Sequence, residues 1–441
     1  MNFDNLKKTD SICYDLVMEE MDRQENTLEL IPSECIASLS VIEALWTPFT
    51  NKYSEWYAHK RYYGWNEVVD KVELLAIERA KKAFPWVEHV NVQPYSWSPA
   101  NMAVYNAVCE VWDKTMWLRL TDGGHITHWL SVSATAKFFS PVLYWLKEDW
   151  YIDLEEVERL AVEYKPKLIW VGATAYSREF PFEEFSRIAK KVWAYLAADI
   201  AHISGLVISW VHKNPAPYVD IITTTTHKTM RGPRGWMIMV TKAWLEHDPD
   251  LAIKIDKSVF PWLQWWPHNH QILSVAVALW EALKPEFKNI NKQIIKNSKT
   301  LANRLIDYGH SLATSWTDNH LILMKVWKWR WAFMQDALDI AGITLNKNTI
   351  PNEPCSPFNP SWIRMWTPIM TMRWMREEEM KQVALWINKV FEIIKDFDYS
   401  SDKEERKKIN SKFKEFIRNN KDLESIKLEV KELCQRFPIY K

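Results

Sequence analysis

The spacing of apolar positions along the chain changes near residue 90. From there, short strand-like runs alternate with a segment whose apolar residues follow a helical period. The runs at 90–93, 167–171 and 195–199 are short and rich in β-branched or other apolar residues, which is typical of buried strands. Residues 182–192, between the last two, carry apolar side chains at helical spacing. This order predicts an α/β domain, with a mostly parallel sheet covered by helices on both faces.

The chain before residue 90 is helical in pattern and irregular between the helices. Residues 1–30 carry a partial apolar stripe, which predicts a polar-faced helical arm. A second helix is expected after Asn66, whose side chain is a suitable N-cap. The predicted apolar face of this second helix consists of Val68, Val72, Leu75 and Ala76. Residues 51–65 crowd ionisable and aromatic groups without a steady period, so we expect a loop with a function there.

Long helical patterns dominate the chain from about residue 275. We expect helices over 273–283 and 290–307 and a strand over 320–325. A last stripe predicts an amphipathic helix docked at the tail, and it consists of Ile409, Phe413, Phe416 and Ile417. The predicted organisation is a helical arm over 1–30, a large domain over 31–280 and a smaller C-terminal α/β domain over 281–441.

Length, charge and cysteine usage narrow the class of protein. The 441 residues include 56 basic and 56 acidic ones, so the net charge of zero does not indicate a nucleic-acid partner. The chain start lacks the apolar run of a signal peptide, and no stretch of eighteen apolar residues follows. The five cysteines are scattered and lack a CxxC spacing. We therefore expect reduced thiols in a cytoplasmic protein that does not span a membrane.

Tryptophan and glycine are out of proportion in this composition. The chain has 27 tryptophans and only 9 glycines, whereas glycine normally makes up about 7% of residues. The two together are 27 + 9 = 36 of 441 residues. This sum is close to a normal glycine share with a few tryptophans added, so tryptophan stands in excess by about as much as glycine is short.

The Thr-rich stretch that contains Lys228 is the strongest candidate for chemistry. A β-branched strand is predicted at 219–224, and glycines and a proline after Lys228 indicate a tight loop. A lysine held at a strand end can lose its proton when it is partly desolvated and near other cations, and it can then attack carbonyls. A surface lysine is the ordinary alternative. Asp199, at the end of another predicted strand, favours the chemical interpretation.

Asp199 and two histidines suggest a cofactor that reacts with Lys228. A carboxylate can keep the pyridine nitrogen of an aldehyde cofactor protonated, which makes the ring an electron sink. Asp199 and His202 alone would more often be a cap and a packed ring. His125 offers a flat ring for stacking; its spacing to His128 also suits zinc, but no third ligand follows at a usual spacing, so we expect no metal.

Four other residues could bind anions or move protons. Ser96 and Ser98 stand at a predicted helix start, where hydroxyls and amides can hold a phosphate. Arg364, among loop formers, could clamp a substrate carboxylate with two parallel hydrogen bonds, or form a surface salt bridge. Glu55 lies among tyrosines, where its pKa could be raised for proton transfer, or it is a plain loop residue.

These stretches together resemble serine hydroxymethyltransferases, a family of fold-type I enzymes that use pyridoxal phosphate. The resemblance runs from about Asn26 to Asn388. Its most specific motifs are Asn51 to Glu55, Lys60 to Gly64, Asn91 to Pro94, Gly123 to His128, Thr223 to Gly235 and Asn346 to Pro351. The resemblance implies reversible transfer of the serine hydroxymethyl group to tetrahydrofolate, with glycine as a product. It also implies a large three-layer domain, a smaller second domain, and a homodimer with shared active sites.

The resemblance also implies residue roles. Lys228 would carry the cofactor, Asp199 would hold its pyridine nitrogen and His125 would stack on its ring. The other cofactor-side positions are Tyr53, Ser96, Trp97, Ser98, Thr174, His202, His227 and Trp266, and His202 and Thr225 are also expected to be catalytic. The substrate-side positions are Ser33, Glu55, Tyr63 and Arg364, with Glu55 as the acid–base group. The folate positions are Tyr62, Leu120 and Asn346.

The chain departs from the family pattern mainly by tryptophan. Smaller departures are Cys35, Ile36, Tyr95 and Thr174. Tryptophan stands at family glycine positions 46, 56, 65, 97, 129, 236, 262, 265, 266, 362, 366 and 374. A bulky residue at positive φ is an outlier, and Trp97 would fill the space of the cofactor phosphate. We hypothesise that most of the 27 are glycine in the cell, from a UGA codon that the host translates as glycine.

Two other functions stay open at this point. One is a folate-independent aldolase acting on 3-hydroxy amino acids, against which the retained Glu55, Tyr62 and Asn346 argue. The other is an inactive relative that serves as a binding protein, which the tryptophans would favour if they are real.

Overall fold

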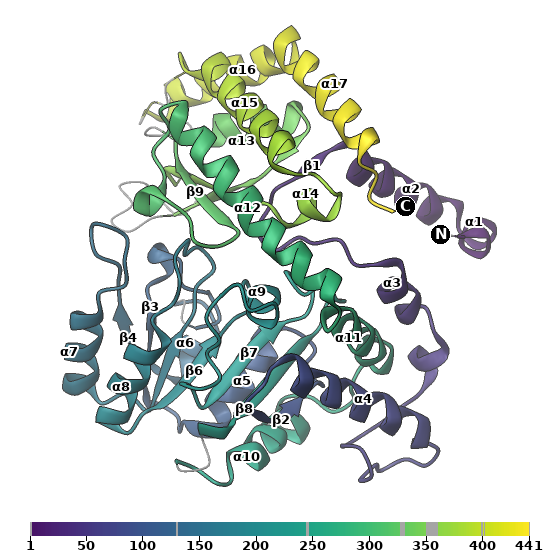
Figure 1. Ribbon diagram of the computed structural model, residues 1–441, viewed down its shortest axis with the longest axis vertical. Helices are drawn as coiled ribbons and strands as arrows, with labels where there is room; N and C mark the ends of the chain where they lie inside the picture. The colour runs from purple at the N-terminus through teal and green to yellow at the C-terminus, as the bar shows by residue number, and fades with distance from the viewer. Residues whose placement is uncertain are drawn as a thin grey trace.

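A computed structural model describes residues 2–128, 131–243, 247–326, 331–349, 360–397, 400 and 402–440. Figure 1 shows a large α/β part, a smaller part that contains the C-terminal helices, and the long helix α12 (Pro285–Asp307) running between them. The N-terminal helices α1 (Asp4–Thr9) and α2 (Ser11–Asn26) project to one side, close to the end of the C-terminal helix α17 (Lys421–Arg436).

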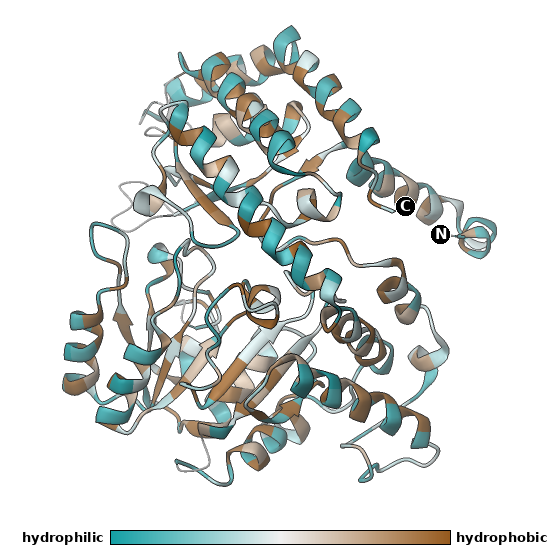
Figure 2. Ribbon diagram, viewed as in Figure 1, coloured by the Kyte–Doolittle hydropathy of each residue, from teal (hydrophilic) through white to brown (hydrophobic). Residues whose placement is uncertain are grey.

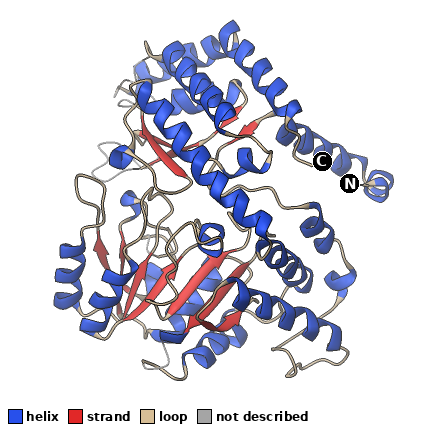
Figure 3. Cartoon of the chain, viewed as in Figure 1, coloured by secondary structure: helices blue, strands red, loops and turns tan. Residues whose placement is uncertain are grey.

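A seven-stranded sheet forms the centre of the large part. Its strand order is β2-β8-β7-β6-β5-β3-β4, and β3 to β7 run parallel while β8 is antiparallel to both neighbours. The bounds are β2 Val87–Asn91, β3 Lys114–Leu118, β4 Ser140–Tyr144, β5 Leu168–Val171, β6 Tyr195–Asp199, β7 Ile221–Thr225 and β8 Trp236–Thr241. Figure 3 shows this sheet with helices around it. The predicted mostly parallel sheet is confirmed.

Alternate residues of the strands pack against helices on opposite faces of the sheet. Ile169 and Val171 of β5 belong to one core, with α4 (Glu67–Ala83), α7 (Leu154–Tyr164), α8 (Phe182–Val192) and α11 (Asn269–Ala282). Leu168 and Trp170 belong to another, with α5 (Trp97–Val108) and α10 (Leu251–Lys257). Short helices α3 (Leu39–Leu45), α6 (Thr135–Phe138) and α9 (Ser204–Ile208) complete this part. The period of two in a strand produces this division.

The smaller part has its own core and two small sheets. Antiparallel strands β11 (Asn346–Asn348), β12 (Trp362–Trp366) and β9 (Leu321–Lys325) form one sheet, and β1 (Leu28–Glu29) pairs with β10 (Ile343–Thr344) in the other. The helices are α13 (Trp331–Ile340), α14 (Pro368–Met372), α15 (Glu377–Ile394), α16 (Lys403–Arg418) and α17. Figure 2 shows apolar and polar sides on these helices, as expected where one side faces a core.

The structure refines several predicted elements. The helix over 182–192 and the strand over 195–199 are confirmed at both ends. Asn66 precedes α4, but its side chain donates to the Tyr63 carbonyl (2.9 Å) instead of capping the helix. Val68 is exposed and Val69 is buried, so the predicted apolar face of α4 was wrong at that position. No helix among the described residues is long and apolar enough to cross a membrane.

The tail of the chain contains two docked helices where one was predicted. The predicted stripe falls on α16, and Phe413 and Ile417 of that stripe are buried in the core of the smaller part. The additional helix α17 contributes Leu423 and Val430 to the same core.

Candidate functional site

The carboxyl ends of three neighbouring strands meet at one edge of the large sheet. Asp199 ends β6 and pairs with Thr223 of β7, and the chain reaches Lys228 just after β7 ends. Gly172 follows β5 with φ of 150°, and a Cβ there would lie 2.3 Å from the backbone oxygen of Asp199. Only glycine lets the backbones approach so closely. The predicted meeting of Asp199 and Lys228 at strand ends is confirmed.

Lys228 is a buried amine without a hydrogen-bond partner. Its side chain is 1% exposed, and Nζ contacts no acceptor among the described residues. Burial lowers the pKa of Lys228 well below its usual value; Asp199 opposes this shift, while Arg364 and Arg234 add to it. The lysine therefore favours its neutral form, which is the nucleophilic one.

Asp199 is a buried carboxylate that stays ionised. Its Oδ2 accepts from Nε1 of Trp97 at 2.7 Å and from Nδ2 of Asn101 at 3.3 Å. His128 Nε2 lies 3.4 Å from the same oxygen, close enough for attraction but not aligned for a hydrogen bond. Burial raises the pKa of Asp199, but His128, His125 and Lys228 outweigh this effect and lower it to about 2. The negative charge is thus available to a cationic N–H group.

His125 presents a flat ring on the opposite side of the same space. Its Nδ1 is 2.6 Å from the Thr127 hydroxyl, and burial, with a further contribution from His128, lowers its pKa well below the usual value. The indole of Trp97 stacks on it with ring centroids 3.2 Å apart and planes 14° apart. Aromatic pairs normally keep their centroids about 4.5–7 Å apart, so the indole is tightly wedged there.

The side chain of Trp97 takes the position that a cofactor ring would need. Lys228, Asp199 and His125 fit such a ring, because they offer an amine, a carboxylate for a ring N–H and a stacking face. The indole lies between His125 and Lys228, with Nζ 3.8 Å from its centroid, and its N–H binds Asp199. A pyridine ring does not fit beside it. We expected Trp97 to collide with the phosphate; in the structure its indole instead occupies the space bordered by His125, Asp199 and Lys228, which we call the ring site.

The other predicted residues near this site are held in different ways. His202 is buried, neither ring nitrogen has a partner among the described residues, and burial lowers its pKa well below the usual value. Burial lowers the pKa of His227 to about 3. Thr225 donates to the Ala201 carbonyl (3.0 Å), and Thr174 donates to the Gly123 carbonyl (3.1 Å). Both threonine hydroxyls are therefore used within the protein.

His320 is a residue that the sequence did not single out. It is fully buried, its ring centroid lies 6.4 Å from that of His202, and both of its nitrogens lack partners in the described part of the chain. Burial lowers its pKa to about 3, with contributions from His212, Lys228 and Arg364. It is the first residue of the strand predicted over 320–325 and directly precedes the observed strand β9. Only its distance to His202, which the sequence does not show, connects it to the site.

Arg364 of β12 brings the smaller part to this edge. Its guanidinium donates to the carbonyls of Thr174 and Pro32 and to Oδ1 of Asn346. Burial lowers the pKa of Arg364 to about 10, and no described carboxylate forms an ion pair with it. Ser33, next to Pro32, has φ of 128°. The structure thus gathers the predicted residues Ser33, Thr174, Asn346 and Arg364.

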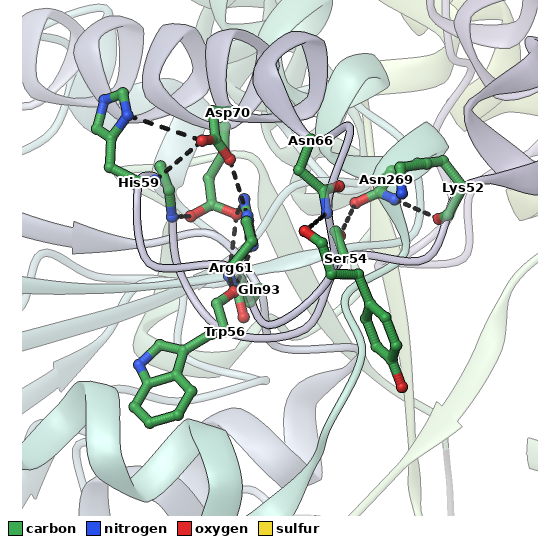
Figure 4. A network of polar contacts seen from close by, with 12 residues as sticks. Lys52, Ser54, Trp56, His59, Arg61, Asn66, Asp70, Gln93 and Asn269 are labelled. Carbon is green, nitrogen blue, oxygen red and sulfur yellow. Dashed lines mark hydrogen bonds and ion pairs between the residues drawn. The ribbon is translucent and has the colours of Figure 1, made fainter.

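The loop around Glu55 is built by a separate polar network (Figure 4). Arg61, whose side chain is 4% exposed, binds Asp70 and Glu73 of α4, at 2.8 Å each. The amide of His59 donates to Asp70 (2.9 Å), and Gln93 donates to Glu73 (2.9 Å). These contacts fix the loop over residues 56–61 against the helix.

The fixed loop is flanked by several predicted residues, of which Glu55 is buried (8% exposed) and three tyrosines lie at the surface. Glu55 Oε2 accepts from Nε1 of Trp266 at 3.2 Å, while Tyr53, Tyr62 and Tyr63 are 48%, 73% and 41% exposed. In the described residues, no hydrogen bond, ion pair or ring contact joins this group to Lys228, Asp199 or His125. The predicted site residues therefore fall into two groups within one chain.

The remaining predicted positions lie near the Lys228 group or outside the residues that the structure describes. Ser96 and Ser98 are exposed at the start of α5, and the Ser96 side chain does not cap the helix. Leu120 is half-buried in the turn that precedes His125. Trp129 and the end of the motif at 346–351 lie outside the described residues. No three described histidine, cysteine or acidic residues gather to hold a metal ion.

Comparison with known proteins identifies the family. The family model of serine hydroxymethyltransferase matches residues 6–387, which extends the motif-based resemblance toward the N-terminus. This family consists of transferases that depend on pyridoxal phosphate, and its fold-type I architecture agrees with the α/β sheet described above. The match covers the Lys228 edge, the Glu55 loop and Arg364, and the chain therefore belongs to the serine hydroxymethyltransferase family.

Proposed function

We propose that the protein transfers the hydroxymethyl group of serine reversibly to tetrahydrofolate, giving glycine and 5,10-methylenetetrahydrofolate. The proposal is carried by one edge of the sheet, where the buried amine of Lys228 lies with the Asp199 carboxylate and the Arg364 cation. Arg364 has no carboxylate partner among the described residues. An amino-acid substrate carries a carboxylate that suits such a cation, and the family's cofactor is an aldehyde that suits such an amine.

Each of these side chains has a distinct task in the proposal. Arg364 binds the substrate carboxylate, and Ser33 borders the same place. With the space of the Trp97 indole open, Asp199 would hold a proton on the nitrogen of a cofactor ring, and His125 would orient that ring by stacking. Pyridoxal phosphate supplies the family with an electron sink. His202, which burial keeps neutral, excludes water and adds no positive charge beside Lys228.

The Glu55 loop supports a homodimer with shared sites. Glu55, Tyr62 and Tyr63 are fixed on a loop that has no contact with Lys228 in the same chain, as far as the described residues go. A loop held so firmly can reach into the site of a second copy. In this arrangement Glu55 moves the proton of the folate-dependent step, and Tyr62, Leu120 and Asn346 contact folate. We place this enzyme in the cytoplasm.

A folate-dependence assay tests the proposal. Glycine formation from serine is measured with and without tetrahydrofolate, in protein that carries the cofactor. We expect tetrahydrofolate to raise the rate by at least about tenfold, since Glu55 should act only in the folate-dependent step. Equal rates with and without it would assign the chain to the aldolases of 3-hydroxy amino acids. Protein from the native host without a visible cofactor band would instead indicate a binding protein, the alternative that Trp97 in the ring site favours.

A further inference from the structure

We infer that residue 97, and the residues written as tryptophan at left-handed turns, are glycine in the working protein. Two kinds of observation carry this inference. The first is the backbone, which is independent of any function. The second is the ring site, and this part rests on the proposed function. The backbone conformation points to individual tryptophan positions that neither composition nor family resemblance could identify.

Tryptophan is concentrated where the backbone is left-handed. Fourteen non-glycine residues in the described part of the chain have positive φ, and eight of them are tryptophans with φ between 58° and 76°. The eight are Trp56, Trp65, Trp86, Trp112, Trp150, Trp193, Trp210 and Trp374. Bulky side chains at such φ are outliers, whereas glycine adopts it freely. Five of the eight, at 86, 112, 150, 193 and 210, were not among the positions that family resemblance suggested.

Three helices end in the same turn with tryptophan at the glycine position. The helices α8, α9 and α14 are followed by Trp193, Trp210 and Trp374, and in each case the next amide bonds back across the turn. These bonds run from Ala194 to Ala189 (3.1 Å), from Val211 to Leu206 (3.0 Å) and from Met375 to Met370 (3.1 Å). The end of α12 has the same bond, from His310 to Leu305 (3.0 Å), with Gly309 at φ of 87°. Glycine is the usual residue of this motif.

The surroundings of many tryptophans do not suit an indole. Trp65 and Trp193 are 88% and 77% exposed. Five others are buried with an N–H that finds no acceptor among the described residues, and these are Trp117, Trp170, Trp236, Trp362 and Trp366. A buried indole N–H normally has a partner, because leaving it unpaired is costly.

Trp386 shows what a fitting tryptophan looks like in this chain. It lies inside α15, is 2% exposed and donates from Nε1 to Oε2 of Glu429 at 2.8 Å. Its φ is not among the positive ones. Trp386 should therefore be a true tryptophan, which makes it the matched control for the others.

Glycine at position 97 would open the ring site. The indole N–H of Trp97 binds Asp199, its face covers His125, and its other face meets Lys228. Removing it frees the carboxylate, the stacking face and the amine together. It also uncovers the start of α5, between Ser96 and Ser98, where backbone amides can bind a phosphate. A host that translates UGA as glycine would account for the single type of replacement.

The first test reads the protein and its gene directly. Peptides of the protein from its native host are sequenced by mass spectrometry, and the codons are read. We expect glycine at 97, 193 and 374 with UGA codons, and tryptophan at 386 with UGG. Indole masses or UGG codons at 97 and 193 would overturn the inference. This result does not depend on the enzyme's activity.

The second test compares two full-length recombinant chains. One has tryptophan as written, and the other has glycine at 97 and at the eight left-handed positions. We expect the glycine chain to have the higher Tm, with about 2 °C or more from Trp193→Gly alone, and only this chain to gain a visible band with pyridoxal phosphate. Trp386→Gly should lower the Tm instead.

The outcomes separate this inference from the proposed function. A glycine chain that is more stable but binds no pyridoxal phosphate would refute the proposed function and the assignment at 97 that rests on it, and would leave the glycine assignment at the eight left-handed positions standing. A tryptophan chain with equal Tm that binds the cofactor as well would overturn the inference. Should neither recombinant chain fold, the native peptide masses and the codons still decide it.

Discussion

Two buried basic side chains of this protein are held in opposite ways. Arg61, in the Glu55 loop, lies against the carboxylates of Asp70 and Glu73, and its side chain is only 4% exposed. Lys228, at the sheet edge, is as deeply buried, but its amine has no hydrogen-bond partner in the described structure. A basic group that is buried without a partner costs stability, so a fold retains it only where it has a task. Arg61 therefore has a structural role, whereas Lys228 has the proposed role in the reaction.

Removal of Lys228 should have the largest effect on function and a small effect on folding. In a chain that binds pyridoxal phosphate, Lys228→Ala should abolish both the borohydride-reducible lysine adduct and serine turnover, because Lys228 is the only buried lysine among the described residues. The Tm should stay or rise, since an unpaired buried amine is removed. Lys242→Ala, at an exposed lysine, is the control. A reducible lysine adduct that survives in Lys228→Ala would refute the assignment.

Substitution of Glu55 should affect only the folate-dependent step. Glu55→Gln removes the titratable proton at nearly constant shape, so folate-dependent serine cleavage should fall by about 10²–10⁴-fold. The cofactor spectrum should be unchanged, because Glu55 has no contact with Lys228 or Asp199 among the described residues of its own chain. Spectral titration with pyridoxal phosphate and a turnover assay measure the two effects. A parallel loss of cofactor binding and turnover would contradict this separation.

Arg61 should behave as the structural counterpart. Arg61→Met removes the cation between Asp70 and Glu73 (Figure 4) and leaves two carboxylates buried together. Breaking a buried ion pair in this way costs about 3–5 kcal/mol of unfolding free energy. Urea unfolding measures the loss, and Arg304→Met, at a half-exposed surface pair, should change it little. An unchanged unfolding midpoint for Arg61→Met would show that the network does not hold the loop.

The contrast between Lys228 and Arg61 also shows which features of the site the sequence could predict. Asp199 ends a short apolar strand and Lys228 follows the end of another strand, and local pattern alone places both at the sheet edge. The network of Arg61 depends on which carboxylates of α4 turn inward, and His320 comes from a different part of the fold, so neither is visible in local spacing. The position of the Trp97 ring also needed the structure. The division of the chain near residue 280 stays a prediction.

The pH dependence of stability should reveal the unpaired amine itself. Burial lowers the pKa of Lys228 in the folded, cofactor-free chain, while the unfolded chain keeps a pKa near the usual value of about 10.4. Between these two values the unfolded state binds one proton more than the folded state. Stability therefore rises with pH, by about 1.4 kcal/mol per pH unit from this group, and is lost as pH falls.

The Lys228→Met variant lacks the titrating amine and its pH-dependent loss of stability. Its unfolding free energy should therefore exceed that of the parent chain, and this margin should grow as pH falls from 9 to 7. Urea unfolding at three pH values measures the margin, and the exposed Lys242→Met serves as the control. Because every other titrating group is the same in both chains, a constant margin would mean that Lys228 keeps its proton in the folded state. Lys228 would then be a buried ammonium attracted to Asp199, and its contrast with Arg61 would be one of degree.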